Sequence, residues 1–291
     1  MEFSAELNGL LKSVSRSFYL SLRFLPKSVR SELSLAYLLA RASDSIADST
    51  TVEVAERMQL LGLTENALQG EIDASFFPRI AALPVDHAGE AILLQRLSAC
   101  FEQFNSVEPR GKALIRSVMR HILRGQTLDL QRFPGALQTD EELDEYTFLV
   151  AGCVGEFWSE MLAWKVPKWA TLPNDEMVAL GRTYGKGLQL VNILRDLPGD
   201  LQQGRCYLPG NEALIEKRNR WATVANEWLD AGARYVKHLN GWRLRFTADL
   251  PWRIGRETLR LLPTTDIQKV KVPRSQVWSI MLSSAWRNLW H

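Results

Sequence analysis

The chain has 291 residues, 46% of them hydrophobic, and a formal net charge of only +2. This length and composition can bury a large core, and no linker or low-complexity tract divides the chain, so we expect one domain over residues 1–291. Its three cysteines are far apart and form no CxxC pair, which argues against a disulfide framework and a thiolate metal site. No signal peptide and no run of 18 apolar residues is visible, so we expect a cytoplasmic protein without a spanning helix.

Apolar residues recur at helical spacing along most of the chain, and alternating strand-like runs are scarce. The pattern predicts an all-α fold. Helices are expected at about residues 3–23, 28–48, 52–70, 88–105, 109–128, 140–164, 174–197, 220–239, 251–261 and 274–289. Several of them are apolar over most of their circumference, so at least one should run through the middle of the domain.

Two pairs of aspartates, each spaced four residues apart, are the first candidate site. Asp44 and Asp48 follow the apolar run SLAYLLA, and Asp196 and Asp200 lie in LVNILRDLPGD. Residues four apart on a helix project together, and close carboxylates repel unless a cation lies between them. Mg2+ is held in this way by one or two carboxylates together with substrate phosphates. A solvated acidic face is the alternative for either pair alone, as at Asp140 and Asp144, where a charged helix begins.

Arginines accompany both pairs. Arg41 stands one turn before Asp44, Arg195 directly precedes Asp196, and Arg16 lies among small hydroxyl residues in SVSRSF. Planar guanidinium groups bind phosphate oxygens in a bidentate manner, although each arginine could equally form a structural salt bridge.

The segment YTFLVAGCVGEFW, residues 146–158, combines Tyr146 with Gly152 and Gly155. Each glycine costs about 1 kcal/mol in a helix relative to alanine. We expect either close packing of a neighbouring helix, which the spacing slightly favours, or space left for a ligand.

The carboxyl-terminal part is basic and rich in tryptophan. Residues 205–291 contain 15 Lys and Arg against 7 Asp and Glu, and seven of the ten Trp. This composition is compatible with peripheral contact with an anionic membrane surface. Tryptophans that fill the core beneath arginine stems are the equal alternative. No nucleic-acid partner is expected.

Together, SVSRSF, ARASDSIAD, YTFLVAGCVGEFW and GLQLVNILRDLPGDLQQGRCYLP resemble the squalene/phytoene synthase family, the head-to-head prenyl transferases. The motifs agree in order and separation over about residues 10–215, and VAGCVG and KVPRSQV look more like a bacterial squalene synthase. The resemblance implies a single isoprenoid-synthase (terpenoid synthase) helical domain with a central cavity, and two aspartate-rich motifs facing each other across its mouth. It also implies that two farnesyl diphosphates are joined through presqualene diphosphate to squalene, with Mg2+ and NADPH, by a monomer.

The resemblance further implies roles for individual residues. Mg2+ would be held by Asp44, Asp48, Asp196 and Asp200. The diphosphates and the metal shell would be bound by Ser15, Arg16, Arg41, Gln189, Asn192, Arg195 and Arg205. The Tyr146 hydroxyl would take or relay a proton in the first half-reaction, and Tyr207 would lie at the rim. The hydrocarbon tunnel would be lined by Phe18, Phe157 and Trp158, unless they only fill the core. NADPH would be contacted by Lys271 and Arg274.

Three departures from the family pattern qualify this expectation. Ala47 and Gly199 stand where squalene synthases usually carry an extra acid. Pro198 lacks an N–H, so the helix is expected to end or kink within the second motif, which makes Asp200 the weakest ligand. The hydrophobic carboxyl-terminal anchor of eukaryotic squalene synthases is absent, and VWSIMLSSAWRNLWH becomes either a surface-seeking amphipathic helix or a part of the core.

Several other activities remain open at this point. A relative could stop at presqualene diphosphate, turn it into hydroxysqualene, or make phytoene from geranylgeranyl diphosphate. No Gly-rich dinucleotide fingerprint is visible, so NADPH rests on the resemblance alone. A non-catalytic, membrane-associated partner of an isoprenoid enzyme is the hypothesis from another class, but all four aspartates and the arginines are present.

Overall fold

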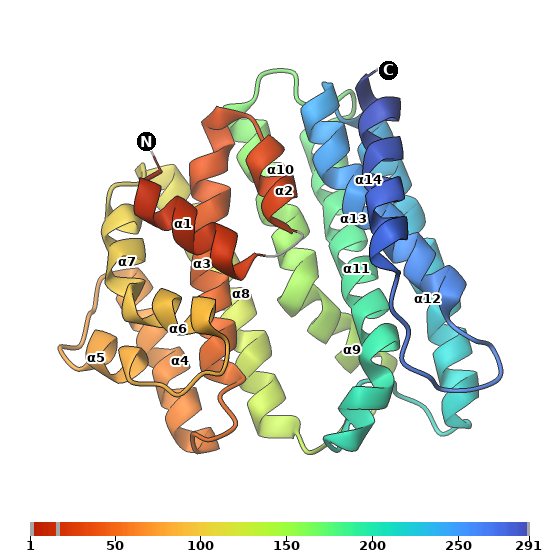
Figure 1. Ribbon diagram of the computed structural model, residues 1–291, viewed down its shortest axis with the longest axis horizontal. Coiled ribbons are helices and arrows are strands. Elements are labelled where there is room, and N and C mark those ends of the chain that lie inside the picture. Colours follow the sequence, from red (N-terminus) through yellow and green to blue (C-terminus); the bar gives the residue numbers. More distant parts are fainter. Residues whose placement is uncertain (1–2, 16–17, 290–291) are drawn as a thin grey trace. The chain divides into compact units, whose positions relative to one another are not determined.

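The computed structural model describes residues 3–15 and 18–289 (Figure 1). The chain folds as two compact units, residues 1–131 and 132–291. Both units are helical, and the strands among the described residues are two short segments in the second unit. The predicted all-α class is therefore confirmed.

The first unit is built around α3. Its helices are α1 (Ala5–Val14), α2 (Phe18–Phe24), α3 (Lys27–Ala47), α4 (Val54–Gln69), α5 (Phe76–Ala81), α6 (Ala88–Gln95), α7 (Leu97–Asn105) and α8 (Pro109–Arg132). Helix α3 packs against α1, α2, α4, α6 and α7. Its apolar side chains, among them Leu35, Leu38 and Ile46, are fully buried. Because α3 has neighbours on all sides, it is a central helix of the kind that its apolar sequence predicts.

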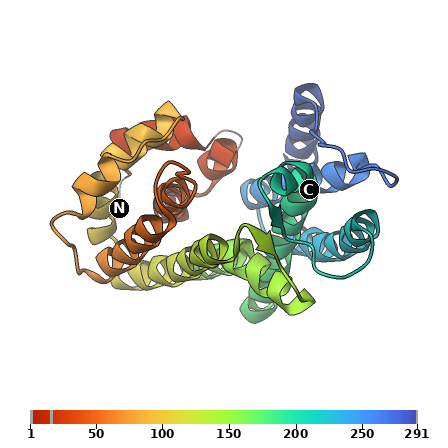
Figure 2. The same cartoon turned by 90° about the horizontal axis from the view of Figure 1, so that it is seen from below.

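The second unit is built around the long helix α11. Its elements are β1 (Gly135–Ala136), α9 (Asp140–Thr147), a π-helical turn η1 (Phe148–Gly152), α10 (Cys153–Lys165), α11 (Asn174–Gln202), β2 (Arg205–Cys206), α12 (Leu214–His238), α13 (Trp242–Leu261) and α14 (Arg274–Leu289). Helix α11 packs against α9, η1, α10, α12 and α13 (Figure 2). The strands β1 and β2 pair in parallel, with Gly135 opposite Arg205.

The glycines of the VAGCVG segment serve helix packing. A Cβ atom on Gly155 would lie 1.9 Å from the carbonyl oxygen of Gly181, and one on Gly181 would lie 2.7 Å from that of Gly155. The backbones of α10 and α11 therefore touch where both helices lack a side chain. Of the two alternatives for these glycines, close packing is the correct one.

Two helices run through prolines that were expected to limit them. Helix α11 continues past Pro198 to Gln202, and α13 begins at Trp242 rather than near Pro251. A proline leaves one carbonyl of the preceding turn without its helical donor. Packing of α11 and α13 on each other and on α12 outweighs that local cost. Of the two predicted effects of Pro198, an end of the helix within the second aspartate motif is therefore wrong, and a kink there stays a prediction.

Two predicted helices are each divided into two, and one short helix was not predicted. The helix expected at 3–23 is described as two helices, with α1 ending at Val14 and α2 beginning at Phe18. The helix expected at 88–105 is divided at Arg96, whose backbone leaves the helical conformation without a glycine or proline to mark it. The short helix α5 was not predicted, because only six residues form it.

Candidate active site

The first aspartate pair lies at the carboxyl-terminal end of α3. Asp44 is in the last helical turn, and Asp48 is the residue that caps the helix. A helix carries partial negative charge at this end, so carboxylates there are electrostatically unfavourable. No basic residue lies in the last turn of α3 to offset them. The local sequence therefore concentrates negative charge where a cation would relieve it.

Arg41 is held by two acids from different helices. Its Nη1 donates to Asp44 Oδ2 at 2.8 Å, and its Nη2 donates to Glu90 Oε1 on α6. The other oxygen of Glu90 accepts a hydrogen bond from Ser45 Oγ at 2.9 Å. Glu90 is 14% exposed at the side chain, and sequence analysis did not identify it. It lies 49 residues from Arg41, so only the tertiary fold brings the two together.

The pKa values of the two acids in this cluster, Asp44 and Glu90, are shifted in opposite directions. Burial raises the pKa of Asp44 to about 6, and the nearby charge of Asp48 adds to the rise, although Arg41 opposes it. Burial also acts to raise the pKa of Glu90, but hydrogen bonds from Arg41 and Ser45 outweigh it and lower the pKa. Glu90 thus serves as the permanent counter-charge of Arg41. Asp44, whose side chain is 43% exposed, remains accessible to a further cation.

The second aspartate pair lies on α11. Because the helix continues past Pro198, Asp196 and Asp200 are one turn apart on the same face. Gln189 and Asn192 precede them on that face, and Asn192 Nδ2 donates to Gln189 Oε1 at 3.4 Å. Asp200 is again in the last turn of its helix, where no basic residue is present. The two pairs thus share a position at the negative end of a helix.

Arg195 forms a two-point contact with its neighbour in the sequence. Its Nε donates to Asp196 Oδ1 at 3.0 Å and its Nη2 to Oδ2 at 2.5 Å. Burial raises the pKa of Asp200 and the charge of Asp196 raises it further, whereas Arg205 and Arg195 partly counteract the rise. The predicted residues Asp196, Asp200, Arg195 and Arg205 therefore act on one another electrostatically.

Tyr146 and Tyr207 lie side by side in the second unit. Their rings are stacked with centroids 4.9 Å apart, and both residues are about 6% exposed. The pairing of β1 with β2 fixes this contact, since Leu137 N donates to Cys206 O at 3.0 Å next to Tyr207. The segment GRCYLP therefore positions Arg205 near Asp200 and Tyr207 on Tyr146.

Lys186 is a second residue that sequence analysis missed. It precedes Gln189 by one turn of α11, its Nζ donates to Asp144, and the same atom lies 4.4 Å from the ring centroid of Trp228. Its side chain is only 13% exposed. The sequence did not reveal this half-buried lysine, because its partner Asp144 belongs to the acidic start of α9, which is typical of an ordinary helix.

The remaining predicted residues are more scattered. Ser15 is buried at the end of α1, and its hydroxyl donates to the Leu11 carbonyl. Phe18 is the first residue of α2, and Arg16 lies outside the described residues. Phe157 is buried on α10, with Trp158 half-buried beside it. Lys271 and Arg274 are exposed, before and at the start of α14.

The donor set of each pair suits a hard divalent cation. Among the described residues no three His, Cys, Asp or Glu side chains gather into a complete metal-binding cluster. Each pair instead offers two carboxylates, which is the protein contribution that Mg2+ needs when phosphate oxygens and water supply its other ligands. Burial, together with the charge of the neighbouring aspartate, raises the pKa of both Asp44 and Asp200.

Comparison with known proteins identifies the family. A family model described as squalene/phytoene synthase matches residues 11–280. A bifunctional lycopene cyclase/phytoene synthase of Blakeslea trispora is 29% identical over 202 residues, which cover 69% of this chain and 31% of that protein. A 15-cis-phytoene synthase of Synechocystis is 28% identical over 82% of this chain and 68% of that one. A squalene synthase of Eremothecium gossypii is 28% identical over 71% and 46%. The chain thus spans about a third of the first relative and under half of the third.

Solved structures show the same fold. The structure of TcSQS with the ligand E5700 matches with a TM-score of 0.80 at 20% identity, and the match covers 97% of this chain and 87% of that one. The squalene synthase HpnC from Alicyclobacillus acidocaldarius matches with a TM-score of 0.58 at 20% identity, over 87% and 90%. At such identity the likeness concerns the fold alone, and it confirms the expected helical terpenoid-synthase class.

Proposed function

The chain belongs to the squalene/phytoene synthase family, whose members are prenyltransferases acting on prenyl diphosphates, and on that premise we propose that it joins two farnesyl diphosphates head to head. In the first half-reaction one substrate loses diphosphate, and its allylic cation is trapped by the double bond of the other. Loss of a proton closes the cyclopropane of presqualene diphosphate. In the second half-reaction this intermediate loses its diphosphate, and hydride from NADPH completes squalene.

The observation that carries the proposal is the setting of the aspartate pairs. Each pair has its carboxylates four residues apart at the negative end of a buried helix, next to an arginine. When bound, Mg2+ would neutralise the charge that develops on the departing diphosphate. Asp44 and Asp48 would hold the ion at one site, and Asp196 and Asp200 at the other. Arg41 and Arg195 already bind carboxylates in geometries that also suit phosphate oxygens.

The other predicted residues enter the proposal as supporting groups. Gln189, Asn192 and Arg205 would bind diphosphate or the metal shell from α11 and β2, with Ser15 and Arg16 as further contacts. Tyr146 would hold or relay the proton lost in the first half-reaction, and its stacking on Tyr207 restricts the ring. Phe157, Trp158 and Phe18 would exclude water from the carbocations, which water would otherwise quench.

A second candidate is phytoene synthesis from geranylgeranyl diphosphate, and the relatives favour it. The two relatives cited first are a bifunctional lycopene cyclase/phytoene synthase and a 15-cis-phytoene synthase. Against it, the VAGCVG and KVPRSQV segments look more like squalene synthase. Synthases that stop at presqualene diphosphate or release hydroxysqualene differ only in the second half-reaction.

A product assay separates these reactions. Purified protein is incubated with Mg2+ and either farnesyl or geranylgeranyl diphosphate, with and without NADPH, and the products are identified by mass. We expect squalene from farnesyl diphosphate only when NADPH is present. Presqualene diphosphate or hydroxysqualene under both conditions would contradict the reductive step. Phytoene from the longer substrate would support the second candidate.

A further inference from the structure

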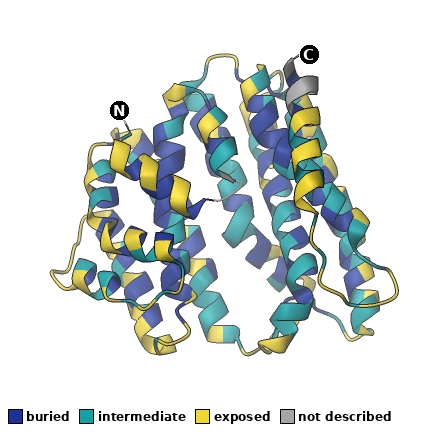
Figure 3. Ribbon diagram, in the orientation of Figure 1, coloured by how far each residue is buried: buried dark blue, intermediate teal, exposed yellow. Residues whose placement is uncertain are grey.

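Helix α14 carries the two most exposed large apolar side chains among the described residues. Trp278 is 61% exposed and Leu282 is 67% exposed, and they lie one turn apart on the same face. Figure 3 shows exposed positions along the outer face of this helix. The other large apolar side chains with high exposure are Val54 on α4, Ile72 in the loop before α5, and Ile92 on α6. Trp278 and Leu282 therefore form an apolar strip.

The opposite face of α14 is fastened to the second unit. Ser284 Oγ donates to Asp249 Oδ2 of α13 at 2.5 Å, and Asn288 Nδ2 lies 3.4 Å from the same oxygen. Asp249 is 4% exposed and also accepts a hydrogen bond from Arg253 Nε at 2.5 Å. This buried polar network fixes the rotation of the helix, so the apolar strip points outward in the folded protein. One face of α14 therefore packs on the second unit, and the other face is exposed to solvent.

The charge along α14 and the segment that leads into it is positive, and the exposed Asp266 and the Glu257 that accepts a hydrogen bond from Gln276 are acids beside it. Residues 267–291 contain no Asp or Glu. Lys269, Lys271 and Arg274 are all exposed in the extended segment and first turn that lead into α14. An apolar helix face beside a cluster of cations is complementary to a surface that is both anionic and apolar beneath.

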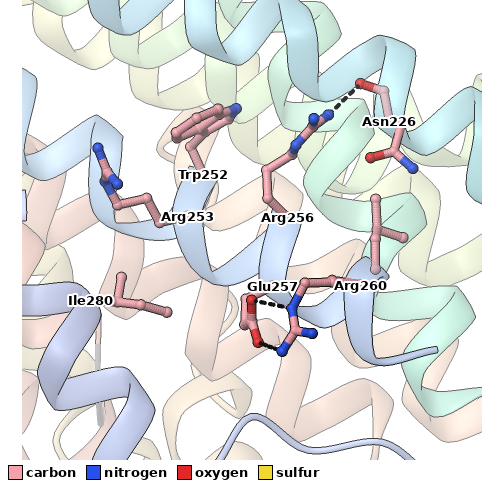
Figure 4. Close-up of a pocket in the computed structure, with 8 residues that line it drawn as sticks. Asn226, Trp252, Arg253, Arg256, Glu257, Arg260 and Ile280 are labelled. Atoms are coloured by element: carbon pink, nitrogen blue, oxygen red, sulfur yellow. Dashed lines mark hydrogen bonds and ion pairs between the residues drawn. The ribbon is translucent and has the colours of Figure 1, made fainter.

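A neighbouring pocket does not account for this surface. A cavity of about 550 Å³ lies between α12, α13 and α14, and Trp252, Ile280 and three arginines line it (Figure 4). The arginines are Arg253, Arg256 and Arg260. Each guanidinium already has a carboxylate partner, namely Asp249, Asp230 and Glu257 respectively. These ion pairs offset part of the positive charge of the pocket, and a separate group of exposed cations precedes α14.

We propose that α14 docks the protein on an anionic phospholipid bilayer. Trp278 and Leu282 enter the interfacial layer, where tryptophan is favoured, and Lys269, Lys271 and Arg274 lie against the lipid phosphates. The contact is peripheral, since no helix within the described part of the chain has the length and apolarity to span a membrane. The inference rests on the surface of α14 and is independent of the reaction. It assigns Lys271 and Arg274 to lipid rather than to NADPH.

Sedimentation with vesicles tests the docking. The full chain is mixed with phosphatidylcholine vesicles, with and without phosphatidylglycerol. We expect binding to the anionic vesicles, and at least about a tenfold loss of affinity when Trp278→Ser and Leu282→Ser are combined. Val54→Ser with Ile72→Ser removes two other exposed apolar side chains, at 38% and 44% exposure, and should leave vesicle binding unchanged. Both double variants should keep the helical circular dichroism spectrum of the native chain, which shows that they fold.

The electrostatic part has its own test. Lys271→Gln combined with Arg274→Gln should weaken binding to anionic vesicles about tenfold or more. Raising the salt from about 0.1 M to about 1 M should have a similar effect on the native chain, because the screening length falls from about 10 Å to about 3 Å. NADPH affinity, measured by fluorescence titration, should not change in this variant. A loss of NADPH affinity with vesicle binding intact would overturn the assignment.

The alternative occupant of the apolar strip is a second copy of this chain. Sedimentation velocity of the native chain and of the Trp278→Ser, Leu282→Ser variant distinguishes the two. The proposal predicts the same sedimentation coefficient for both, without lipid. A native dimer that the double substitution converts to a monomer, together with equal binding to neutral and anionic vesicles, would overturn it.

Discussion

The arginine beside the aspartate pair on α3 and the arginine beside the pair on α11 are held in place by different kinds of contact. Arg41 is fixed between Asp44 and Glu90, a residue of another helix, so its position depends on the tertiary structure. Arg195 binds both oxygens of the residue beside it in the sequence, so its contact is local. The first pair is therefore sensitive to changes at a distance. The second depends mainly on the continuity of α11.

Removal of the first pair should have the largest effect. Asp44→Asn combined with Asp48→Asn is expected to lower turnover of farnesyl diphosphate by at least about a thousandfold, because a bound metal contributes several kcal/mol to the transition state. The helical circular dichroism spectrum should be unchanged. Glu141→Gln with Glu145→Gln is the matched control, since it removes two acids at the same spacing from the start of α9. Turnover that survives the aspartate substitutions would remove the metal assignment.

Substitution of Asp196 alone and substitution of Asp200 alone should lower activity by similar amounts. Because Pro198 does not end the helix, Asp200 is placed as regularly as Asp196, and we expect Asp196→Asn and Asp200→Asn each to cost about 3 kcal/mol of transition-state stabilisation, roughly a hundredfold in rate. The measurement is kcat/KM as a function of Mg2+ concentration. A near-normal Asp200→Asn enzyme beside an inactive Asp196→Asn enzyme would show that only Asp196 acts as a ligand.

Removal of the Glu90 charge that holds Arg41 in place should lower activity by a smaller factor. Glu90→Gln keeps the size of the side chain but removes the charge that holds Arg41, and residues that orient metal ligands typically contribute about 10- to 100-fold to activity or metal affinity. We expect a loss in this range, with a higher Mg2+ requirement and an unchanged KM for NADPH. Glu6→Gln breaks the exposed ion pair of Glu6 with Arg96 in the same unit and serves as the control. Equal activity of the two variants would contradict the role of Glu90.

The smallest expected effect concerns stability without metal. The pKa of Asp44 rises from its ordinary value of 3.8 to about 6 on folding, so the native state binds the proton more tightly than the unfolded state. Stability is therefore lost as pH rises from 3.8 to about 6, and above that range the full cost is present. Asp44→Asn should raise the free energy of unfolding at neutral pH by only about 1 kcal/mol, because solvent screens a half-exposed side chain and the ion pair with Arg41 is lost.

Urea unfolding in the presence of a chelator measures this gain at neutral pH and at about pH 4, where it should disappear. A gain of the same size at both pH values would mean that the carboxylate charge is not its cause.

The sequence was sufficient to predict the helical class, the presence of at least one central helix and the pairing of carboxylates, because these depend on local periodicity. It failed at Pro198 and Pro251, where contacts among α11, α12 and α13 outweigh the proline. Glu90 could not be found from spacing, since it reaches Arg41 across 49 residues, and Lys186 was concealed by the acidic start of α9. The features that the sequence did not predict depend on contacts between helices that are distant in sequence.

The central claim is that the aspartate pairs hold the magnesium that withdraws diphosphate from the prenyl chain. Release of inorganic diphosphate from farnesyl diphosphate, followed against Mg2+ concentration, tests it most directly. The account predicts no release without Mg2+, saturable release with it, and none when either pair is replaced by asparagine. Release that proceeds in the presence of a chelator, or that persists in both substituted proteins, would contradict it.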